Sequence, residues 1–240
     1  MENLLRLLWR SALPAAGNFL GSVLAELVPM TARRLSLTLH AAAGILLAVV
    51  AVELMPEALR QAPPWIVITS FTAGGLVFIA LDHFLENIRT RAGKSSRSGP
   101  WTIYASVAID LISDGIMIGV GSVVSERLAL VLALGQALAD VPQALATMAL
   151  LQERTSRAHR IGLAVLLTVP LYVGSIFGYF VLRGRSRLAQ FGVLGFTAGL
   201  LTTLAVEEII PQAHERGESH AAAAAFVIAF AAFIALTSYL

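Results

Sequence analysis

The interiors of eight long stretches of this chain contain neither Lys nor Arg. A bilayer core about 30 Å thick is crossed by a helix of about 20 predominantly apolar residues, so stretches of this kind are candidate membrane spans. Only 13% of the 240 residues are charged and 57% are hydrophobic, whereas about 25% of the residues of a soluble domain are charged. The chain is therefore predicted to be an all-α integral membrane protein.

The eight spans are expected to be helices, because a backbone in lipid must satisfy its own hydrogen bonds. They are predicted at 12–30, 39–58, 66–85, 101–124, 127–151, 161–182, 188–211 and 220–239. Eight helices leave only short connections, so residues 1–240 are predicted to form a single transmembrane domain. The longest connection, 86–100, is basic and rich in Ser and Gly, and we expect it to be a flexible cytoplasmic loop.

The distribution of Lys and Arg predicts the orientation of the chain. Ten of these residues fall in the odd-numbered connections between spans, and seven fall in the termini and the even-numbered connections. The positive-inside rule therefore favours both termini outside. The segment after Met1 lacks a clear small-residue cleavage site, so we expect it to remain uncleaved. A compact chain of this type favours a prokaryotic inner membrane.

Composition and missing motifs exclude several classes of function. The chain contains no Cys, which excludes disulfides and thiolate metal sites, and its net charge of +2 offers no basic face for nucleic acid. Paired buried Asp residues could activate water in an intramembrane aspartyl protease, but the Gly-x-Gly-Asp signature is absent. HExxH and GxSxG are absent as well. We therefore expect neither enzyme activity nor a prosthetic group.

Acidic residues lie within the predicted spans, where no Lys or Arg accompanies them in mid-span. Glu26, Glu53, Glu207 and Glu208 are examples. An ionised carboxylate at the bilayer centre costs about 2.5–3.5 kcal/mol on insertion scales, unless it meets a counter-charge or water. A single acid can be a protonated carboxyl bonded to a neighbouring helix. A set of them instead indicates protons or a mobile cation as partners, and hence a cation pathway.

The fourth and fifth spans carry the most specific arrangement of these acids. Asp110 and Asp114 are four residues apart, which places both carboxylates on one helical face, where a divalent cation or a shared proton would relieve their repulsion. Asp140 and Gln143 are three residues apart on the next span. Pro142 between them leaves a backbone carbonyl one turn earlier without its usual donor. Together they predict an oxygen-rich cation site, although a proline kink can also serve packing alone.

Two distant segments, 43–58 and 198–213, resemble each other at a constant offset of 155 residues. Because five spans separate them, they run in opposite directions, so they predict an inverted repeat that relates spans 1–3 to spans 6–8. A chance match between two apolar helices is the alternative. Glu207 and Glu208 differ by about 100° around their helix, so both cannot face one site. The matched positions are Gly44/Gly199, Glu53/Glu208, Pro56/Pro211 and Ala58/Ala213.

These motifs resemble the ZRT/IRT-like (ZIP) family of divalent metal transporters over nearly the whole chain. The family's fourth span carries His-Asn-x-x-(Glu/Asp)-Gly, and residues 110–115 read Asp-Leu-Ile-Ser-Asp-Gly, which keeps the acid and the Gly. On the fifth span, residues 139–144 read Ala-Asp-Val-Pro-Gln-Ala, which matches the family at Asp140, Pro142 and Gln143. The His and Asn of the fourth span and the first ligand of the fifth are replaced.

The resemblance implies a 3+2+3 helical arrangement, a homodimer, and an elevator-like movement of four helices that carries a divalent metal to the cytoplasm. It implies a substrate site formed by Asp110, Asp114, Asp140 and Gln143, completed by Glu53, Glu207 or Glu208. Because these ligands are all oxygens, the site suits Mn²⁺, Fe²⁺, Mg²⁺ or Ca²⁺ at least as well as Zn²⁺. The alternative is a ZIP-like metal sensor or scaffold that has lost transport along with its missing ligands.

Overall fold

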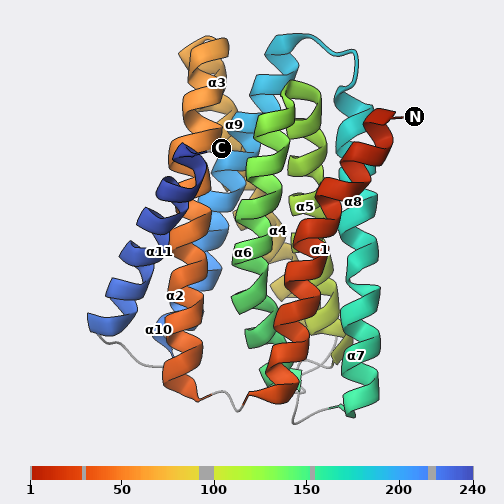
Figure 1. Cartoon of the computed structure of the whole chain (residues 1–240), viewed down its shortest axis with the longest axis vertical. Helices are drawn as coiled ribbons and strands as arrows, with labels where there is room; N and C mark the ends of the chain where they lie inside the picture. Colours follow the sequence, from red (N-terminus) through yellow and green to blue (C-terminus); the bar gives the residue numbers. More distant parts are fainter. Residues whose placement is uncertain (1, 29–30, 92–99, 152–154, 216–219, 240) are drawn as a thin grey trace.

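The computed structural model describes residues 2–28, 31–91, 100–151, 155–215 and 220–239, and every regular element in these ranges is a helix. Figure 1 shows the helices standing side by side along one long axis. They are α1 (Glu2–Leu27), α2 (Ala32–Ala48), η1 (Val49–Leu54), α3 (Met55–Gln61), α4 (Pro64–Arg91), α5 (Pro100–Val124), α6 (Glu126–Leu151), α7 (Arg157–Leu166), α8 (Thr168–Leu182), α9 (Arg187–Leu204), η2 (Ala205–Ile209), α10 (Ile210–His214) and α11 (His220–Ser238).

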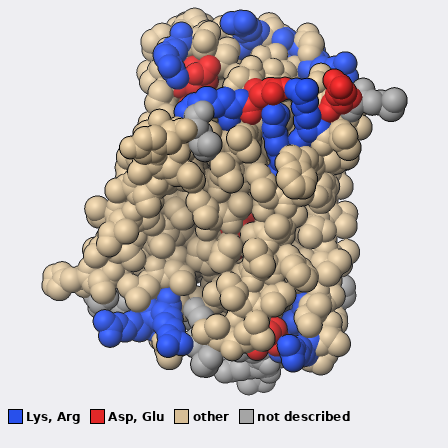
Figure 2. Space-filling view, viewed as in Figure 1, with Lys and Arg blue, Asp and Glu red and all other residues tan. Residues whose placement is uncertain are grey.

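Seven helical stretches in the described chain are long and apolar enough to cross a membrane. The prediction of an all-helical integral membrane protein is thereby confirmed. On the face shown in Figure 2, Lys, Arg, Asp and Glu gather towards the two ends of the molecule, and the broad belt between them is tan except for a small patch of red. The seven stretches are Ala32–Gln61, Pro64–Leu81, Val107–Val124, Glu126–Ala149, Arg157–Leu182, Arg187–His214 and His220–Ser238.

Helix α1, which contains most of the first predicted span (12–30), is not among these seven stretches. Its 26 residues include Arg6, Arg10 and Glu26, and its buried positions include Ser11 and Asn18, so its mean hydropathy is low. It nevertheless packs along α6 as its main neighbour. Polar residues within α1 thus face other helices.

The loop predicted at 86–100 is shorter than expected. Helix α4 continues to Arg91 and α5 begins at Pro100, so the first residues of the predicted loop are helical. Residues 92–99 lie outside the part of the chain that the structure describes. Three other helices begin at side-chain caps, in which the hydroxyls of Thr31, Ser156 and Ser186 accept hydrogen bonds from backbone N–H groups three residues later.

The helices form two bundles. In the first bundle, α1 packs against α6, α8 packs against α5, and α5 contacts α6. In the second bundle, α11 packs against α2, and α4 packs against α9. The bundles meet where α2 contacts α6 and where α5 contacts α9. The two spans that carry the predicted Asp motifs, α5 and α6, therefore both belong to the first bundle and line its boundary with the second.

The offset of 155 residues also relates helix contacts. At Gly44 in α2 the backbone lies against the carbonyl of Phe226 in α11, and at Gly199 in α9 it lies against the carbonyl of Phe71 in α4. Both the glycines and the phenylalanines are separated by 155 positions. In Figure 1, α2 runs towards the end of the molecule that bears α3, whereas α9 runs towards the opposite end. The two glycine contacts therefore stand at matching positions on helices that run in opposite directions.

A π-helical segment precedes the proline in each of the two segments that resemble each other. The π-helical segment η1 comes directly before the turn that contains Pro56, and η2 comes directly before the turn that contains Pro211. A π-helical turn holds an extra residue and is frequent at functional sites. Glu53 lies in η1, and Glu207 and Glu208 lie in η2. All three acids therefore lie on backbone that departs from the regular α-helix.

Enlarging the glycines at these contacts is expected to destabilise the protein. A Cβ at Gly199 would collide with the carbonyl of Phe71, whereas nothing lies within 4 Å of a Cβ at Gly162. Overpacking costs about 1–3 kcal/mol, so Gly199→Val should lower the midpoint of thermal unfolding in detergent by at least about 2 °C. The control Gly162→Ala should leave it unchanged or higher. Equal midpoints for the two variants would contradict the close packing of α9 on α4.

Candidate functional site

Asp114 lies halfway along α5 and is only 2% exposed. Nε2 of Gln136 on α6, a fully buried side chain, donates a hydrogen bond to Oδ1 of Asp114. The Oε1 atom of Gln136 is buried and has no hydrogen-bond partner in the described structure. The pair therefore joins α5 to α6 and leaves an unused amide oxygen beside a carboxylate.

Asp140 lies one helical turn after Gln136 on α6 and is also 2% exposed. Its Oδ2 atom is buried without a hydrogen-bond partner among the described residues. Leaving a buried polar atom without a partner costs about 1–3 kcal/mol, and more for a charged group. Such atoms need a partner, and a bound cation supplies one for an oxygen. Pro142 lies inside α6, which continues through it without a break.

Asn18 on α1 brings a third buried oxygen to the same region. Gly17 and Gly21 allow the backbone of α1 to lie against the carbonyls of Ala137 and Val141 on α6. Asn18 is therefore held alongside the stretch of α6 that carries the second carboxylate. Its Oδ1 atom is buried and lacks a hydrogen-bond partner within the described ranges.

A cavity of about 70 Å³ opens beside Asn18. A single water requires about 10–15 Å³ by the same measure, so the space holds several waters or a partly hydrated ion. The cavity lies at the boundary of the two bundles, and α1, α5 and α6 face η2 and α10 across it. Its polar lining is Asn18, Asp110, Gln143, Thr147, Glu208 and Gln212.

Four carboxylates, two of which line the cavity, act on one another electrostatically. The charges of Asp110 and Asp140 act on Asp114, and the charge of Glu208 acts on Asp110. Three of these acids lie in the first bundle and Glu208 lies in the second. Because like charges repel, the group favours the entry of a cation between the bundles.

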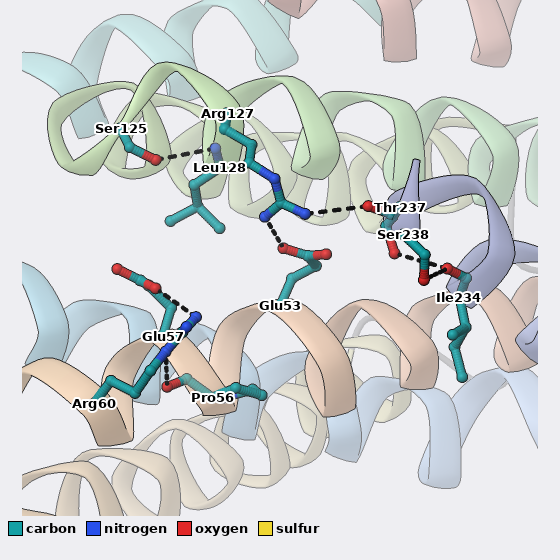
Figure 3. Close-up of polar contacts among 10 residues, drawn as sticks. All are labelled: Glu53, Pro56, Glu57, Arg60, Ser125, Arg127, Leu128, Ile234, Thr237 and Ser238. Atoms are coloured by element: carbon teal, nitrogen blue, oxygen red, sulfur yellow. Dashed lines mark hydrogen bonds and ion pairs between the residues drawn. The ribbon is translucent and has the colours of Figure 1, made fainter. Parts of the chain in front are cut away.

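Glu53 lies elsewhere, in an ion pair that the sequence did not predict. The Nη1 atom of Arg127 lies 3.2 Å from Oε2 of Glu53, and its Nη2 donates a 3.1 Å hydrogen bond to the carbonyl of Thr237. Figure 3 shows Arg127 on α6 reaching across to η1 and to the end of α11. Arg127 precedes Asp140 by 13 residues, or about 20 Å along the helix. Glu53 is thus buried with a guanidinium partner, away from the cavity.

Glu207 and Glu208 face different directions, as their angular separation predicts. Glu208 lines the cavity and accepts a 3.3 Å hydrogen bond from Gln212. Glu207 is exposed and is not among the cavity-lining residues of the described structure. Asp110, Asp114, Asp140, Gln143 and Glu208 are therefore brought to one region, whereas Glu53 and Glu207 are not.

Glu26 also has a fixed cationic partner, which corrects the expectation that the acids in the spans lack one. Both of its carboxylate oxygens bind the guanidinium of Arg160 on α7, at 2.5 and 2.8 Å, and both side chains are about nine-tenths buried. Arg157 lies 3.8 Å from the same carboxylate. The folding of the chain brings together charges that are 134 residues apart, which spacing along the sequence cannot reveal.

Besides lacking Glu53 and Glu207, the candidate site includes two residues that the sequence did not predict. Asn18 and Gln136 provide buried oxygens and were not predicted. A usable signal existed, because Gln136 precedes Asp140 by four residues, and Asn18 is a polar residue within an apolar stretch. No group of three or more His, Asp or Glu side chains in the described ranges is arranged to hold a metal ion. Amide oxygens therefore count among the available ligands.

Comparison of the chain with models of known protein families finds no match, and neither does comparison with curated proteins.

Proposed function

We propose that this protein is a divalent metal transporter that carries its substrate ion through the site between α5 and α6. The observation that carries the proposal is a set of three buried oxygens, on Asn18, Gln136 and Asp140, that have no hydrogen-bond partner in the described structure, together with the carboxylate of Asp114 that Gln136 bonds. Buried carboxylate and amide oxygens, which carry full or partial negative charge, are what a transported cation requires in a bilayer.

The family resemblance is retained as part of this proposal. We propose eight spans in a 3+2+3 arrangement, with α1 as the first span, because α1 packs along α6 and is long enough to cross a bilayer. The inverted helix contacts at Gly44 and Gly199 support the repeat. A homodimer and a prokaryotic inner membrane complete the proposal, with both termini outside.

The ligand chemistry favours hard and borderline divalent ions. Carboxylate, amide and carbonyl oxygens suit Mn²⁺, Mg²⁺ and Ca²⁺, whereas Zn²⁺ sites more often include His or Cys. Asn18, Asp114, Gln136 and Asp140 offer oxygens alone. We therefore propose Mn²⁺ as a better substrate than Zn²⁺.

Transport would proceed by movement of the first bundle against the second. The residues that line the cavity lie towards the end of the molecule at which α1 ends and α2 begins. Arg127 joins the bundles at the opposite end. With both termini outside, this conformation opens towards the cytoplasm. Alternating access then requires the contacts of Arg127 with Glu53 and Thr237 to break when the outer side opens.

Uptake into proteoliposomes tests the proposal. The purified chain should transport Mn²⁺ faster than Zn²⁺ and Cd²⁺, with Fe²⁺ and Mg²⁺ included in the panel and protein-free liposomes as the blank. Absence of flux for every ion would refute transport. Metal binding in detergent without flux would support the alternative of a metal sensor or scaffold.

Removal of the Arg127 contacts is expected to populate a second conformation. Loss of a charged hydrogen bond and a half-exposed ion pair removes about 1–2 kcal/mol, which shifts a two-state equilibrium about 5- to 30-fold. Spin labels at Ser125 and Leu59 report the distance between the bundles by double electron–electron resonance. Arg127→Gln should add a second distance, absent from the wild type.

The matched control is Arg60→Gln. Arg60 pairs with Glu57 within α3, at 2.9 Å, and so does not join the bundles. The distribution of distances between the spin labels in Arg60→Gln should equal that of the wild type. The locking role of Arg127 would be disproved by a single, unshifted distance in both variants.

A further inference from the structure

Three histidines gather in the second bundle, on the far side of α2 from the carboxylate site. His40 on α2, His214 at the end of α10 and His220 at the start of α11 line one open groove of about 690 Å³. Phe226 and Val227 of α11 form part of its apolar wall. In Figure 1, α2 begins, α10 ends and α11 begins at the same end of the molecule.

The rings of His40 and His214 are close enough to share one ion. Their centroids are 5.0 Å apart and their planes are inclined by 76°. Two imidazoles bound to a tetrahedral metal at about 2.0–2.1 Å have their ring centres about 5 Å apart. The observed separation therefore fits a metal held between two ring nitrogens.

The hydrogen bonds of the two rings fix which nitrogen is available. Nδ1 of His40 lies 2.8 Å from the carbonyl oxygen of Ser36, and Nδ1 of His214 lies 2.9 Å from that of Ile210. A carbonyl oxygen only accepts hydrogen bonds, so Nδ1 must carry the proton in each ring. Nε2 is then left with a free lone pair in both.

This is the arrangement found at metal-binding histidines, which almost always donate their second ring N–H to a carbonyl or carboxylate. His40 is 6% exposed, so helix packing holds its ring in place, whereas His214 is exposed to the groove. The anchors come from residues four positions earlier on the same helices, so both rings are oriented before any ion arrives.

We propose that the Nε2 atoms of His40 and His214 bind a borderline transition-metal ion such as Zn²⁺, Ni²⁺ or Cu²⁺, in a second site separate from the carboxylate site. Imidazole nitrogen selects these ions over Mg²⁺ and Ca²⁺. Since no described group of three His, Asp or Glu is arranged around a metal, water supplies the remaining ligands. An ion with water ligands exchanges readily, as a site for sensing or passing on metal requires.

Electron paramagnetic resonance with Cu²⁺ tests this site independently of transport, because coordinated nitrogen splits the Cu²⁺ signal and carboxylate oxygen does not. One equivalent of Cu²⁺ added to the full chain in detergent should show coupling to at least two nitrogens. The same signal in Asp140→Asn is expected if the site is separate from the carboxylates, and its loss there would overturn that separation.

Variants of the histidines complete the test. His214→Ala should weaken Cu²⁺ binding at least tenfold and reduce the number of coupled nitrogens, and His40→Gln should do the same. The exposed His83 on α4 provides the control, and His83→Ala should leave the signal unchanged. The proposal fails if the wild type shows no nitrogen coupling, or if His214→Ala matches the wild type. Neither failure bears on the carboxylate site, which is tested separately by the uptake of Mn²⁺ into proteoliposomes.

Discussion

Asp140→Asn is expected to lower the initial rate of Mn²⁺ uptake into proteoliposomes by at least about a hundredfold. The substitution keeps the size of the side chain and replaces one carboxylate oxygen by an amide group that repels a cation. Oδ2 of Asp140 is buried without a hydrogen-bond partner in the described structure, so no other group compensates for the lost charge. Removing one partner of a buried pair of charges costs about 3–5 kcal/mol. A hundredfold change in rate corresponds to about 2.7 kcal/mol, which is less than this cost.

Asp114→Asn should behave in the same way, since Asp114 is equally buried and is bonded to Gln136. Glu57→Gln is the matched control, because Glu57 pairs with Arg60 within one helix and does not line the cavity. Its uptake rate should stay within twofold of the wild type. Wild-type rates in both Asp variants, at equal protein incorporation, would show that the ion takes another route.

Glu26→Gln is expected to cause the largest loss of stability among single changes at ion pairs. Glu26 accepts two hydrogen bonds from Arg160, which also donates to the carbonyl of Thr155. Breaking such a buried pair leaves Arg160 uncompensated and costs about 3 kcal/mol or more. For a chain of this size that loss lowers the midpoint of thermal unfolding by about 6–12 °C.

The control for this prediction is Glu126→Gln. Glu126 pairs with Arg6 and Arg10, but its side chain is 65% exposed, and exposed pairs contribute about 0–1 kcal/mol. Its midpoint should fall by no more than about 3 °C. Replacing both partners, as in Glu26→Met with Arg160→Met, should restore part of the stability. A midpoint for Glu26→Gln equal to that of Glu126→Gln would refute the structural role of the buried pair.

The sequence predicted the helical spans well, because the cost of charge in a bilayer is read directly from composition. Seven of the eight predicted spans correspond to helices apolar enough to cross a membrane. The first does not, since α1 mixes apolar residues with polar ones such as Asn18 that face other helices. Hydropathy alone cannot distinguish a helix whose polar face is exposed to lipid from a helix whose polar face is buried against a neighbouring helix.

The site was predicted in part, for a similar reason. Helical spacing placed Asp110 and Asp114 on one face, and both lie near Asp140. The sequence could not predict that Arg127 would reach Glu53, because those residues are 74 positions apart and are joined only by the packing of α6 on η1. A charge at the end of a span has no visible partner until the helices are assembled.

The two segments that match at an offset of 155 residues show which features sequence and structure each reveal. The matched glycines at 44 and 199 were visible as a pattern, but their contacts with Phe226 and Phe71 required coordinates. The same holds for η1 and η2, since hydropathy carries no signal for a π-helical turn. A proline after an apolar run indicates a change in backbone hydrogen bonding without specifying its form.

Equilibrium binding of Mn²⁺ to the purified full chain in detergent tests the central claim most directly. We use Mn²⁺ because it prefers oxygen ligands to imidazole, and we predict one tightly bound ion per chain in the wild type. A double variant, Asp114→Asn with Asp140→Asn, should bind none while retaining the wild-type helical spectrum. Unchanged Mn²⁺ stoichiometry and affinity in that variant would contradict a cation site between α5 and α6.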